Sequence, residues 1–243
     1  MVRVIVISRN QESSIEEMVY SLRGQLPNYP RTFVLDRCED NSAGVLTALG
    51  EEFIVKEEGE GWEAGKTRNF GLKHYNYSGD FIVLDGDRYP SGLTQKKVEE
   101  ALKNFDITLI SLSKDNRGWF CKDLSEEIKV NTHIGLKKNH FMTPGFIIRS
   151  KALLACIQRN GGNLFHPDMD GVWGFEDMAL GDLAALLGLT VGGMPRTMWL
   201  SGHFNKDESR ESSEKKQSIR ARIAQDLLAN NSNKRLTLWW KKK

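Results

Sequence analysis

Short apolar runs that alternate with helix-like segments are the feature of this sequence that most constrains its fold. Within the first 90 residues these runs fall at 3–8, 31–36, 53–57 and 81–85. The helix-like segments between them fall at 13–26, 42–50 and 67–75. Strands of this length joined by helices favour an α/β fold in which a mostly parallel sheet carries helices on both faces. In such a sheet, ligands bind beyond the carboxyl ends of the strands.

The alternation loosens after Pro90. Further helices are predicted at 96–105, 151–162 and 175–189, and further strands at 107–113, 144–150 and 190–200. In the first helix, Ser13 or Ser14 followed three residues later by a glutamate predicts a capping box. Residues 206–230 are polar with helical propensity, and the sequence contains no internal repeat or low-complexity linker.

Charge divides the chain into two parts. The whole chain carries a net charge of +2, but from Lys206 onward eleven Lys and Arg face five Asp and Glu, a net +6, which leaves −4 before it. We therefore expect one acidic domain over 1–205 and a basic, helical extension over 206–243. The extension suits contact with the phosphates of a membrane, a saccharide lipid or a nucleic acid. A solvated helical face with a frayed end explains the same pattern.

Targeting signals and cysteine pairs are missing from the sequence. No apolar run reaches the roughly 18–20 residues of a membrane-spanning helix, and the N-terminus lacks a basic segment followed by an apolar core. A cytoplasmic protein is the expectation. The cysteines, Cys38, Cys121 and Cys156, are odd in number and widely spaced, so we expect free thiols.

Two carboxylates stand directly after the fourth apolar run, at Asp85 and Asp87, with Gly86 between them. Adjacent like charges destabilise each other unless a cation lies nearby. Carboxylate oxygens are hard ligands that suit Mg²⁺ or Mn²⁺ and leave coordination positions for water and substrate phosphates. The alternative is a strand that ends in a polar turn, because Asp-Gly is a common turn signal.

Polar residues also follow the neighbouring strands. Asn10 comes after the first strand in VIVISRN, and Asp36 ends the second in VLDRCEDNS. We expect both at the same edge of the sheet as Asp85 and Asp87, because parallel strands end on one side.

These segments, taken in order, resemble the GT-A nucleotide-sugar glycosyltransferases, especially the family-2-like group. VIVISRNQESSIEEMVYSL resembles the family's first strand and helix, and VLDRCEDNS its second strand. GWEAGKTRNFGL resembles the helix with an Ala/Gly-x-x-Arg-Asn-x-Gly pattern, FIVLDGD the D-x-D strand, and GVWGFEDMALGDLAALLGL the Trp-Gly-x-Glu-Asp helix. The resemblance covers about residues 2–204.

The resemblance implies roles on the donor side of a site. Asp36 would accept a hydrogen bond from the base or ribose of the nucleotide, with Asn10 nearby. Arg68 and Asn69 would lie beside the diphosphate, where a cation and a helix N-terminus favour anions. Asp85 would bind ribose, metal or metal-bound water.

The resemblance also implies the metal and catalytic groups. Asp87 would hold Mn²⁺ or Mg²⁺, with His203 as a further ligand. Asp177 would be the general base for the acceptor hydroxyl, with Glu176 beside it, and Trp173 would line the sugar site. Structural alternatives stay open: acids at a helix start interact with the helix dipole, a lone histidine is often structural, and a tryptophan often packs in a core.

Two other segments, 59–67 and 166–170, allow different interpretations. Residues 59–67, GEGWEAGKT, approach a P-loop but miss its spacing by one residue, and they satisfy G-x-G-x-x-A after the third strand rather than the first. Glu57, Glu58 and Glu60 would repel a pyrophosphate there. The segment HPDMD, 166–170, suggests either a metal site or an acceptor-side loop.

The substrates are less constrained. Asp36 is followed by Arg37 rather than by a second acid, which leaves the base open, although uracil is expected. The stereochemical outcome also stays open, and a retaining enzyme would not need Asp177 as base. We expect transfer of a single hexose, with UDP-glucose favoured. Trp239 and Trp240 before three lysines suit a phosphate-rich acceptor.

These features leave two possible acceptors and one non-enzymatic alternative. One is DNA with hydroxymethylated or glycosylated bases, which would place the enzyme in the host cytoplasm if it is encoded by a phage. Another is a lipopolysaccharide or lipid-linked oligosaccharide reached by peripheral contact. The third makes the chain a nucleotide-sugar or nucleic-acid binding protein without turnover.

Overall fold

The computed structural model describes residues 1–59, 63–112, 144–169, 176–200, 218–219 and 222–223. The elements follow one another in the order β1 (Val2–Ser8), α1 (Glu12–Gln25), β2 (Arg31–Asp36), α2 (Ser42–Leu49), β3 (Glu52–Lys56), α3 (Ala64–His74), β4 (Asp80–Asp85), β5 (Arg88–Pro90), α4 (Gln95–Asn104), β6 (Ile107–Leu112), β7 (Gly145–Ile148), α5 (Ser150–Arg159), η1 (Pro167–Met169), α6 (Glu176–Leu186) and β8 (Val191–Leu200).

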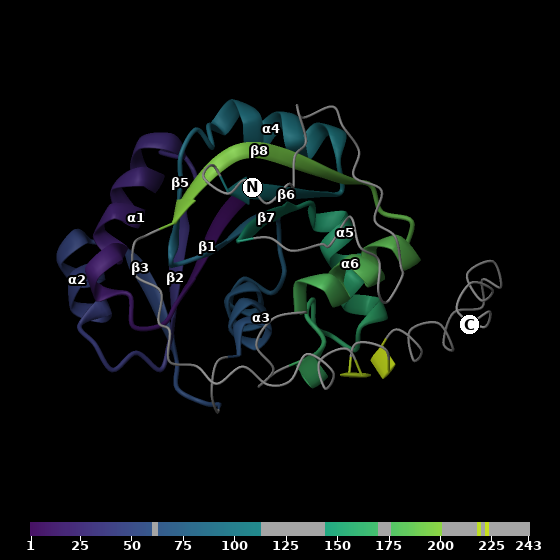
Figure 1. Ribbon diagram of the computed structural model, residues 1–243, viewed down its shortest axis with the longest axis horizontal. Coiled ribbons are helices and arrows are strands. Elements are labelled where there is room, and N and C mark those ends of the chain that lie inside the picture. Colours follow the sequence, from purple (N-terminus) through teal and green to yellow (C-terminus); the bar gives the residue numbers. More distant parts are fainter. Residues whose placement is uncertain (60–62, 113–143, 170–175, 201–217, 220–221, 224–243) are drawn as a thin grey trace.

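One sheet organises these elements, with eight described strands in the order β3-β2-β1-β4-β7-β6-β8-β5. The pairs β3–β2, β2–β1, β1–β4 and β6–β8 are parallel, whereas β7 is antiparallel to β4 and β6, and β5 to β8. The chain moves from β1 outward to β2 and β3, then returns to place β4 on the other side of β1 (Figure 1). In open α/β sheets, ligands bind in the crevice where the strand order reverses, and this point corresponds here to the carboxyl ends of β1 and β4.

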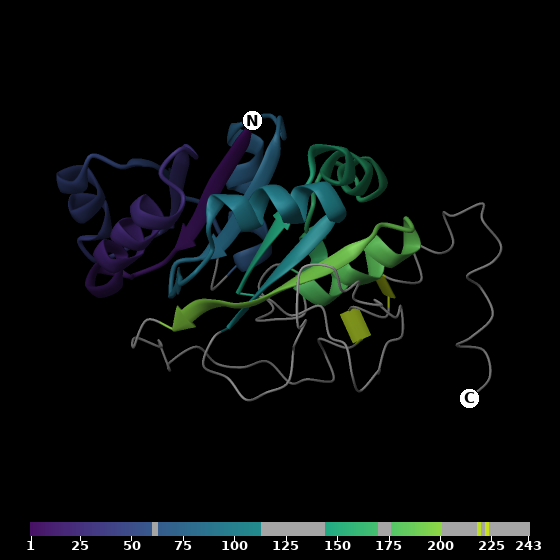
Figure 2. The ribbon, with the colours of Figure 1, turned by 90° about the horizontal axis from the view of Figure 1, so that it is seen from above.

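Both faces of the sheet are covered by helices, as the apolar runs predict. Helices α1, α2 and α4 lie on one face and α3, α5 and α6 on the other (Figure 2). Within β1, Val4 and Val6 pack toward α1 and α4, while Ile5 and Ile7 pack toward α3. Alternate residues therefore enter different cores, and a strand buried on both sides needs an unbroken apolar run. The predicted α/β fold is confirmed.

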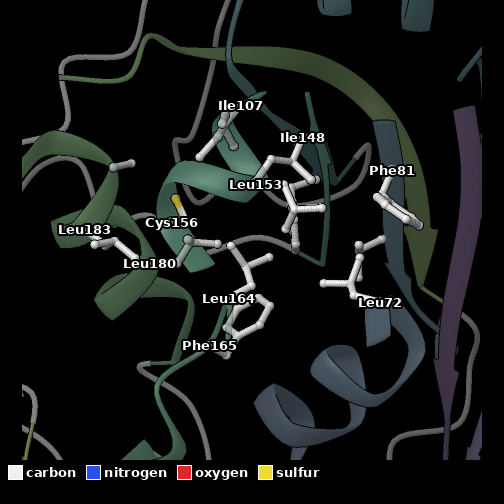
Figure 3. Packing of buried hydrophobic residues seen from close by; sticks show 14 of the residues in the cluster. Leu72, Phe81, Ile107, Ile148, Leu153, Cys156, Leu164, Phe165, Leu180 and Leu183 are labelled. Carbon is white, nitrogen blue, oxygen red and sulfur yellow. The ribbon is translucent and has the colours of Figure 1, made fainter. Parts of the chain in front are cut away.

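The core on the α3 side brings distant parts of the chain together. Leu164 and Phe165, which precede η1, pack beside Leu72 of α3 and Leu180 of α6 (Figure 3). Cys156 of α5 lies in the same cluster, fully buried, and burial raises the pKa of its thiol to about 12. The described cysteines, Cys38 and Cys156, are free thiols as expected.

A short part of the C-terminal segment packs onto this core. Ile223 is 2% exposed and belongs to the apolar cluster under α6, and Ile219 packs against it. Arg222 Nη2 donates to Asp168 Oδ2 of η1 at 2.8 Å. The rest of the predicted helical extension lies outside the described residues. None of the helices in the described ranges is long and apolar enough to span a bilayer.

The start of the first helix differs from the prediction. Helix α1 begins at Glu12, and Gln11, the residue before it, makes no side-chain capping bond. The capping box at Ser13 or Ser14 is therefore wrong. Ser14 lies inside the helix, where its hydroxyl donates instead to Gln11 Oε1 at 2.9 Å.

Candidate functional site

The turn after β4 is pressed against the end of β1. Asp85, the last residue of β4, is in register with Ile7. The backbone N–H of Gly86 donates to the Ile7 carbonyl at 2.7 Å. A Cβ on Gly86 would lie 2.7 Å from that carbonyl oxygen and 3.1 Å from Ser8 Cβ. Only glycine allows the turn to lie this close to β1, and the close contact fixes the positions of Asp85 and Asp87 relative to the end of β1.

Arg68 of α3 is a buried cation beside this turn. Its Nη2 lies 2.6 Å from Asp85 Oδ1, and its Nη1 lies 2.9 Å from Glu176 Oε1 at the start of α6. The guanidinium also covers the ring of Phe165, 5.2 Å from its centroid. Burial opposes the charge, but the carboxylates of Asp85, Glu176 and Asp177 together raise the pKa of Arg68. One buried guanidinium therefore joins the carboxyl end of β4 to the first turn of α6.

Asp87 follows, with its side chain 24% exposed and its Oδ1 3.5 Å from Arg88 Nε. Burial raises the pKa of its carboxyl group to about 6, with Arg88 opposing the shift and Asp85 adding to it. Its ionised form would therefore gain from a further cation. Among the residues that the structure describes, no group of three or more His, Cys, Asp and Glu side chains could hold a metal ion. A divalent ion here would be held by one or two carboxylates, which suits an ion that also binds substrate phosphates. The donor set fits Mn²⁺ or Mg²⁺.

The two acids at the start of α6 have different surroundings. Glu176 is 8% exposed, and its Oε2 is buried without a hydrogen-bond partner among the described residues, although Oε1 pairs with Arg68. Asp177 is half-buried, and its Oδ1 accepts from the N–H of Met178 at 2.8 Å. The first turn of α6 thus contains Glu176, which is buried and paired with Arg68, and Asp177, which is more accessible to solvent.

Asp36 lies at the end of β2, fully buried. Its Oδ1 accepts from Arg37 Nε at 2.7 Å and Lys56 Nζ at 3.0 Å. Its Oδ2 accepts from Arg37 Nη2 at 3.1 Å and Thr67 Oγ1 at 2.9 Å. Burial alone would raise its pKa, but these hydrogen bonds hold the pKa below its usual value. Both carboxylate oxygens of Asp36, which was predicted to accept a hydrogen bond from the nucleoside, are thus engaged with protein groups.

The two predicted asparagines shape the backbone around the site. Asn10 has a φ of 52°, and its Oδ1 accepts from the N–H of Glu39 at 2.8 Å, which ties the loop after β1 to the loop after β2. Asn69 accepts from the N–H groups of Leu164 and Phe165 at 3.1 and 3.0 Å, and its Nδ2 donates to the Phe165 carbonyl at 2.8 Å. In this structure Asn69 holds the segment that covers Arg68.

The structure places Arg68, Asp85, Asp87, Glu176 and Asp177 around the carboxyl end of β4, with Asn10 and Asp36 at the neighbouring strand ends. Trp173 and His203 lie outside the described residues, as does the last residue of HPDMD.

Sequence reasoning missed Lys56, Thr67 and Phe165. Lys56 carried one available signal: it closes a short apolar strand, in a position that a parallel register would place beside Asp36.

Comparison with known proteins identifies a family for this chain. The sequence matches the family described as Glycosyl transferase family 2 over residues 3–157. No curated protein matches it significantly.

Three solved structures share the fold. S. aureus TarS 1–349 in complex with UDP-GlcNAc is similar with a TM-score of 0.71 at 19% identity, covering 95% of this chain and 67% of the TarS chain. The mannosyltransferase PcManGT from Pyrobaculum calidifontis, in complex with GDP-Man and Mn²⁺, gives 0.59 at 13% identity, covering 94% and 74%. A protein described as a glucose-1-phosphate thymidylyltransferase from Bacillus anthracis gives 0.54 at 12% identity, covering 92% and 96%.

Identities this low show the fold alone, and the fold is shared by a protein described with a different activity. The family match, in contrast, spans more than half of the chain and includes β1, β2, β4 and Arg68. This chain belongs to glycosyl transferase family 2 and is a glycosyltransferase of the GT-A fold.

Proposed function

We propose that this protein transfers a single hexose from a UDP-sugar to an acceptor hydroxyl, with Mn²⁺ or Mg²⁺ as cofactor. The observation that carries the proposal is the meeting of Asp85, Asp87, Glu176 and Asp177 around Arg68 at the β1–β4 crevice. The TarS complexes with UDP-GlcNAc and with UDP support a uridine nucleotide. UDP-glucose is the predicted donor, and UDP-GlcNAc is the comparison to make first.

Each acid has a distinct part in the proposed reaction. Asp87, with Asp85 beside it, would hold the divalent ion, which neutralises charge on the diphosphate when bound. Asp177 takes the proton of the acceptor hydroxyl while the acceptor oxygen bonds to the anomeric carbon. The bond from that carbon to the diphosphate oxygen breaks, and UDP leaves with the electron pair. This assignment gives inversion at the anomeric carbon.

Glu176 and Arg68 complete the arrangement. Because Oε1 of Glu176 is held by Arg68, its buried Oε2 is directed by the protein rather than by solvent. We assign Oε2 to a donor-sugar hydroxyl, which would supply the missing hydrogen bond. The remaining predicted contacts, Trp173 at the sugar and His203 at the metal, belong to the same proposal.

The class of acceptor is inferred from the positive charge of the C-terminal segment and not from the residues around Arg68. The basic segment from Lys206 suits a phosphate-bearing acceptor, and we propose DNA with hydroxymethylated bases, in the cytoplasm of a phage-infected cell. A lipopolysaccharide or lipid-linked oligosaccharide is the alternative acceptor. Substituting the three final lysines by glutamine should weaken DNA binding and lower its salt dependence. Unchanged binding would refute the DNA assignment.

Release of UDP from UDP-glucose and UDP-GlcNAc in the presence of Mn²⁺, with and without acceptors, tests the reaction. Asp87→Asn should abolish metal-dependent release, and Asp177→Asn should abolish transfer while leaving UDP binding intact. If the wild-type protein binds nucleotide sugars but consumes none with any acceptor, the chain is a binding protein and the catalytic assignment fails.

A further inference from the structure

Lys56 is a buried lysine whose three N–H groups are all used. Its side chain is 3% exposed at the end of β3. Nζ donates to Asp36 Oδ1 at 3.0 Å, to Glu63 Oε2 at 2.9 Å and to the carbonyl of Glu58 at 2.7 Å. An ammonium group has three donors. The three partners belong to the end of β2, to the residues after β3 and to the residue before α3, so one side chain joins three segments at the carboxyl edge of the sheet.

The backbone after β3 passes close to this ammonium group, and the close approach requires glycine at position 59. Gly59 has a φ of 126°, a conformation that favours glycine. A Cβ at Gly59 would lie 2.0 Å from Glu63 Oε2 and 3.0 Å from Lys56 Nζ. No other residue type fits there without displacing the ion pair. The Lys56–Glu63 ion pair therefore leaves room only for glycine at position 59.

The charges around Lys56 are balanced within the interior. Asp36 also binds Arg37, whose Nη2 lies 3.9 Å from Glu63 Oε2. Lys66 lies 3.5 Å from the other oxygen of Glu63, but its side chain is 44% exposed. Burial raises the pKa of Glu63, but the hydrogen bond and charge of Lys56, together with the charges of Lys66 and Arg37, lower it by more, so that the net pKa is lowered. Lys56 is thus the buried cation that two buried carboxylates share.

We propose that Lys56 is a positioning residue of the donor site. It fixes Asp36, the backbone at Glu58–Gly59 and the start of α3 relative to one another, and this fixed unit binds the nucleoside of the donor. The same geometry gives Asp36 its part, because both of its oxygens are engaged with protein groups and its side chain is fully buried. Asp36 acts by holding this unit. The unit continues into Thr67, which bonds Asp36, and into the adjacent Arg68, which bonds Asp85.

This inference rests on the proposed function, since it assumes that a nucleotide sugar binds at this edge. Sites of this kind gain affinity from groups fixed before the ligand arrives. Loss of the ammonium would leave Asp36 and Glu63 without their buried cation, and only the partly exposed Arg37 would remain near both carboxylates. The unit would then shift or take up water, and the donor would bind a less ordered site.

The test compares UDP binding by calorimetry and steady-state kinetics in four full-length proteins. Wild type is compared with Lys56→Met, with the double variant Lys56→Met/Glu63→Gln, and with Lys66→Met. Lys56→Met should weaken UDP binding about tenfold, as expected for one orphaned buried charge. The KM for the donor should rise more than kcat falls. Circular dichroism and melting curves verify that each variant is folded.

The double variant separates positioning from general damage. It removes one charge of each sign, so most of the lost UDP affinity should return. Lys66→Met removes the exposed cation from the same Glu63 carboxylate and should bind UDP within twofold of wild type, since exposed pairs contribute little. UDP binding by Lys56→Met equal to wild type, or a double variant no better than the single one, would overturn the inference. A wild-type protein that binds no nucleotide would instead overturn the proposed function.

Discussion

Replacing Arg68 by methionine tests the central ion-pair arrangement. The variant keeps an unbranched apolar stem against Phe165 but removes the cation between Asp85 and Glu176, 2.6 and 2.9 Å from its nitrogens. Removing one partner of a buried ion pair costs about 3–5 kcal/mol, because the other charge stays buried. The Asp85 side chain is 23% exposed and can be hydrated in part, whereas the Glu176 side chain is only 10% exposed. We therefore expect the lower end, about 3 kcal/mol.

The measurement is urea unfolding at neutral pH, supported by scanning calorimetry. A loss of this size should lower the melting temperature by about 6–12 °C, at about 2–4 °C per kcal/mol for a chain of this length. Arg149→Met is the matched control, because that side chain is 42% exposed and lies 3.8 Å from Asp106. Its effect should stay below about 1 kcal/mol.

A second variant isolates the electrostatic cause. Adding Glu176→Gln to Arg68→Met removes the more buried of the two orphaned charges, so part of the lost stability should return. A single-variant loss below about 1 kcal/mol would mean that Arg68 is solvated and does not join β4 to α6. Equal losses in the single and double variants would assign the effect to packing against Phe165 instead.

Further perturbations test the turn, the acidic end of β2 and the C-terminal segment. Gly86→Ala should lower both the melting temperature and Mn²⁺-dependent activity, because its Cβ would lie 2.7 Å from the Ile7 carbonyl; an unchanged protein would mean that the turn is not pressed against β1. The lowered pKa of Asp36 contributes stability that is present above its unfolded pKa and is lost as pH falls through its folded pKa. Asp36→Asn should therefore be less stable than wild type at neutral pH, with a gap that narrows toward acid pH in urea titrations; a gap independent of pH would contradict the ion pairing. Ile223→Ala should cost about 2–3 kcal/mol, as for other buried aliphatic truncations, and no change in urea midpoint would show that this residue is not part of the core.

The fold could be predicted well from the sequence because its strands are buried on both faces. Runs such as 81–85 contain enough apolar residues to fill two cores, and helices of matching spacing lie between them. The antiparallel β7 and the short β5 were less predictable. Their pairing depends on strands far away in sequence, with β5 meeting β8 at Leu200 and Met198.

The site was predictable where the chemistry is carried by strand ends and less so where it depends on register. The strand ends indicate the convergence of Asn10 and Asp36 with Asp85 and Asp87, because parallel strands end at one edge, whereas the acids of α6 were expected there only from the family resemblance. It does not show that Asn69 would hold Leu164 and Phe165, 95 and 96 residues away. A lysine at a strand end ordinarily suggests a solvated side chain, and only the pairing of Lys56 with Asp36 reveals a buried one.

The burial of Ile223 affects how the chain can fold during its synthesis. The described residues of the core beneath α1, α2 and α4 are all made once Met194 has left the ribosome. The opposite core, which includes Leu180 and Leu183, receives Ile223 only 29 residues later. A nascent chain therefore carries one closed and one open apolar face for part of its synthesis. Ribosome stalling within that interval should leave the α6 face accessible to chaperones.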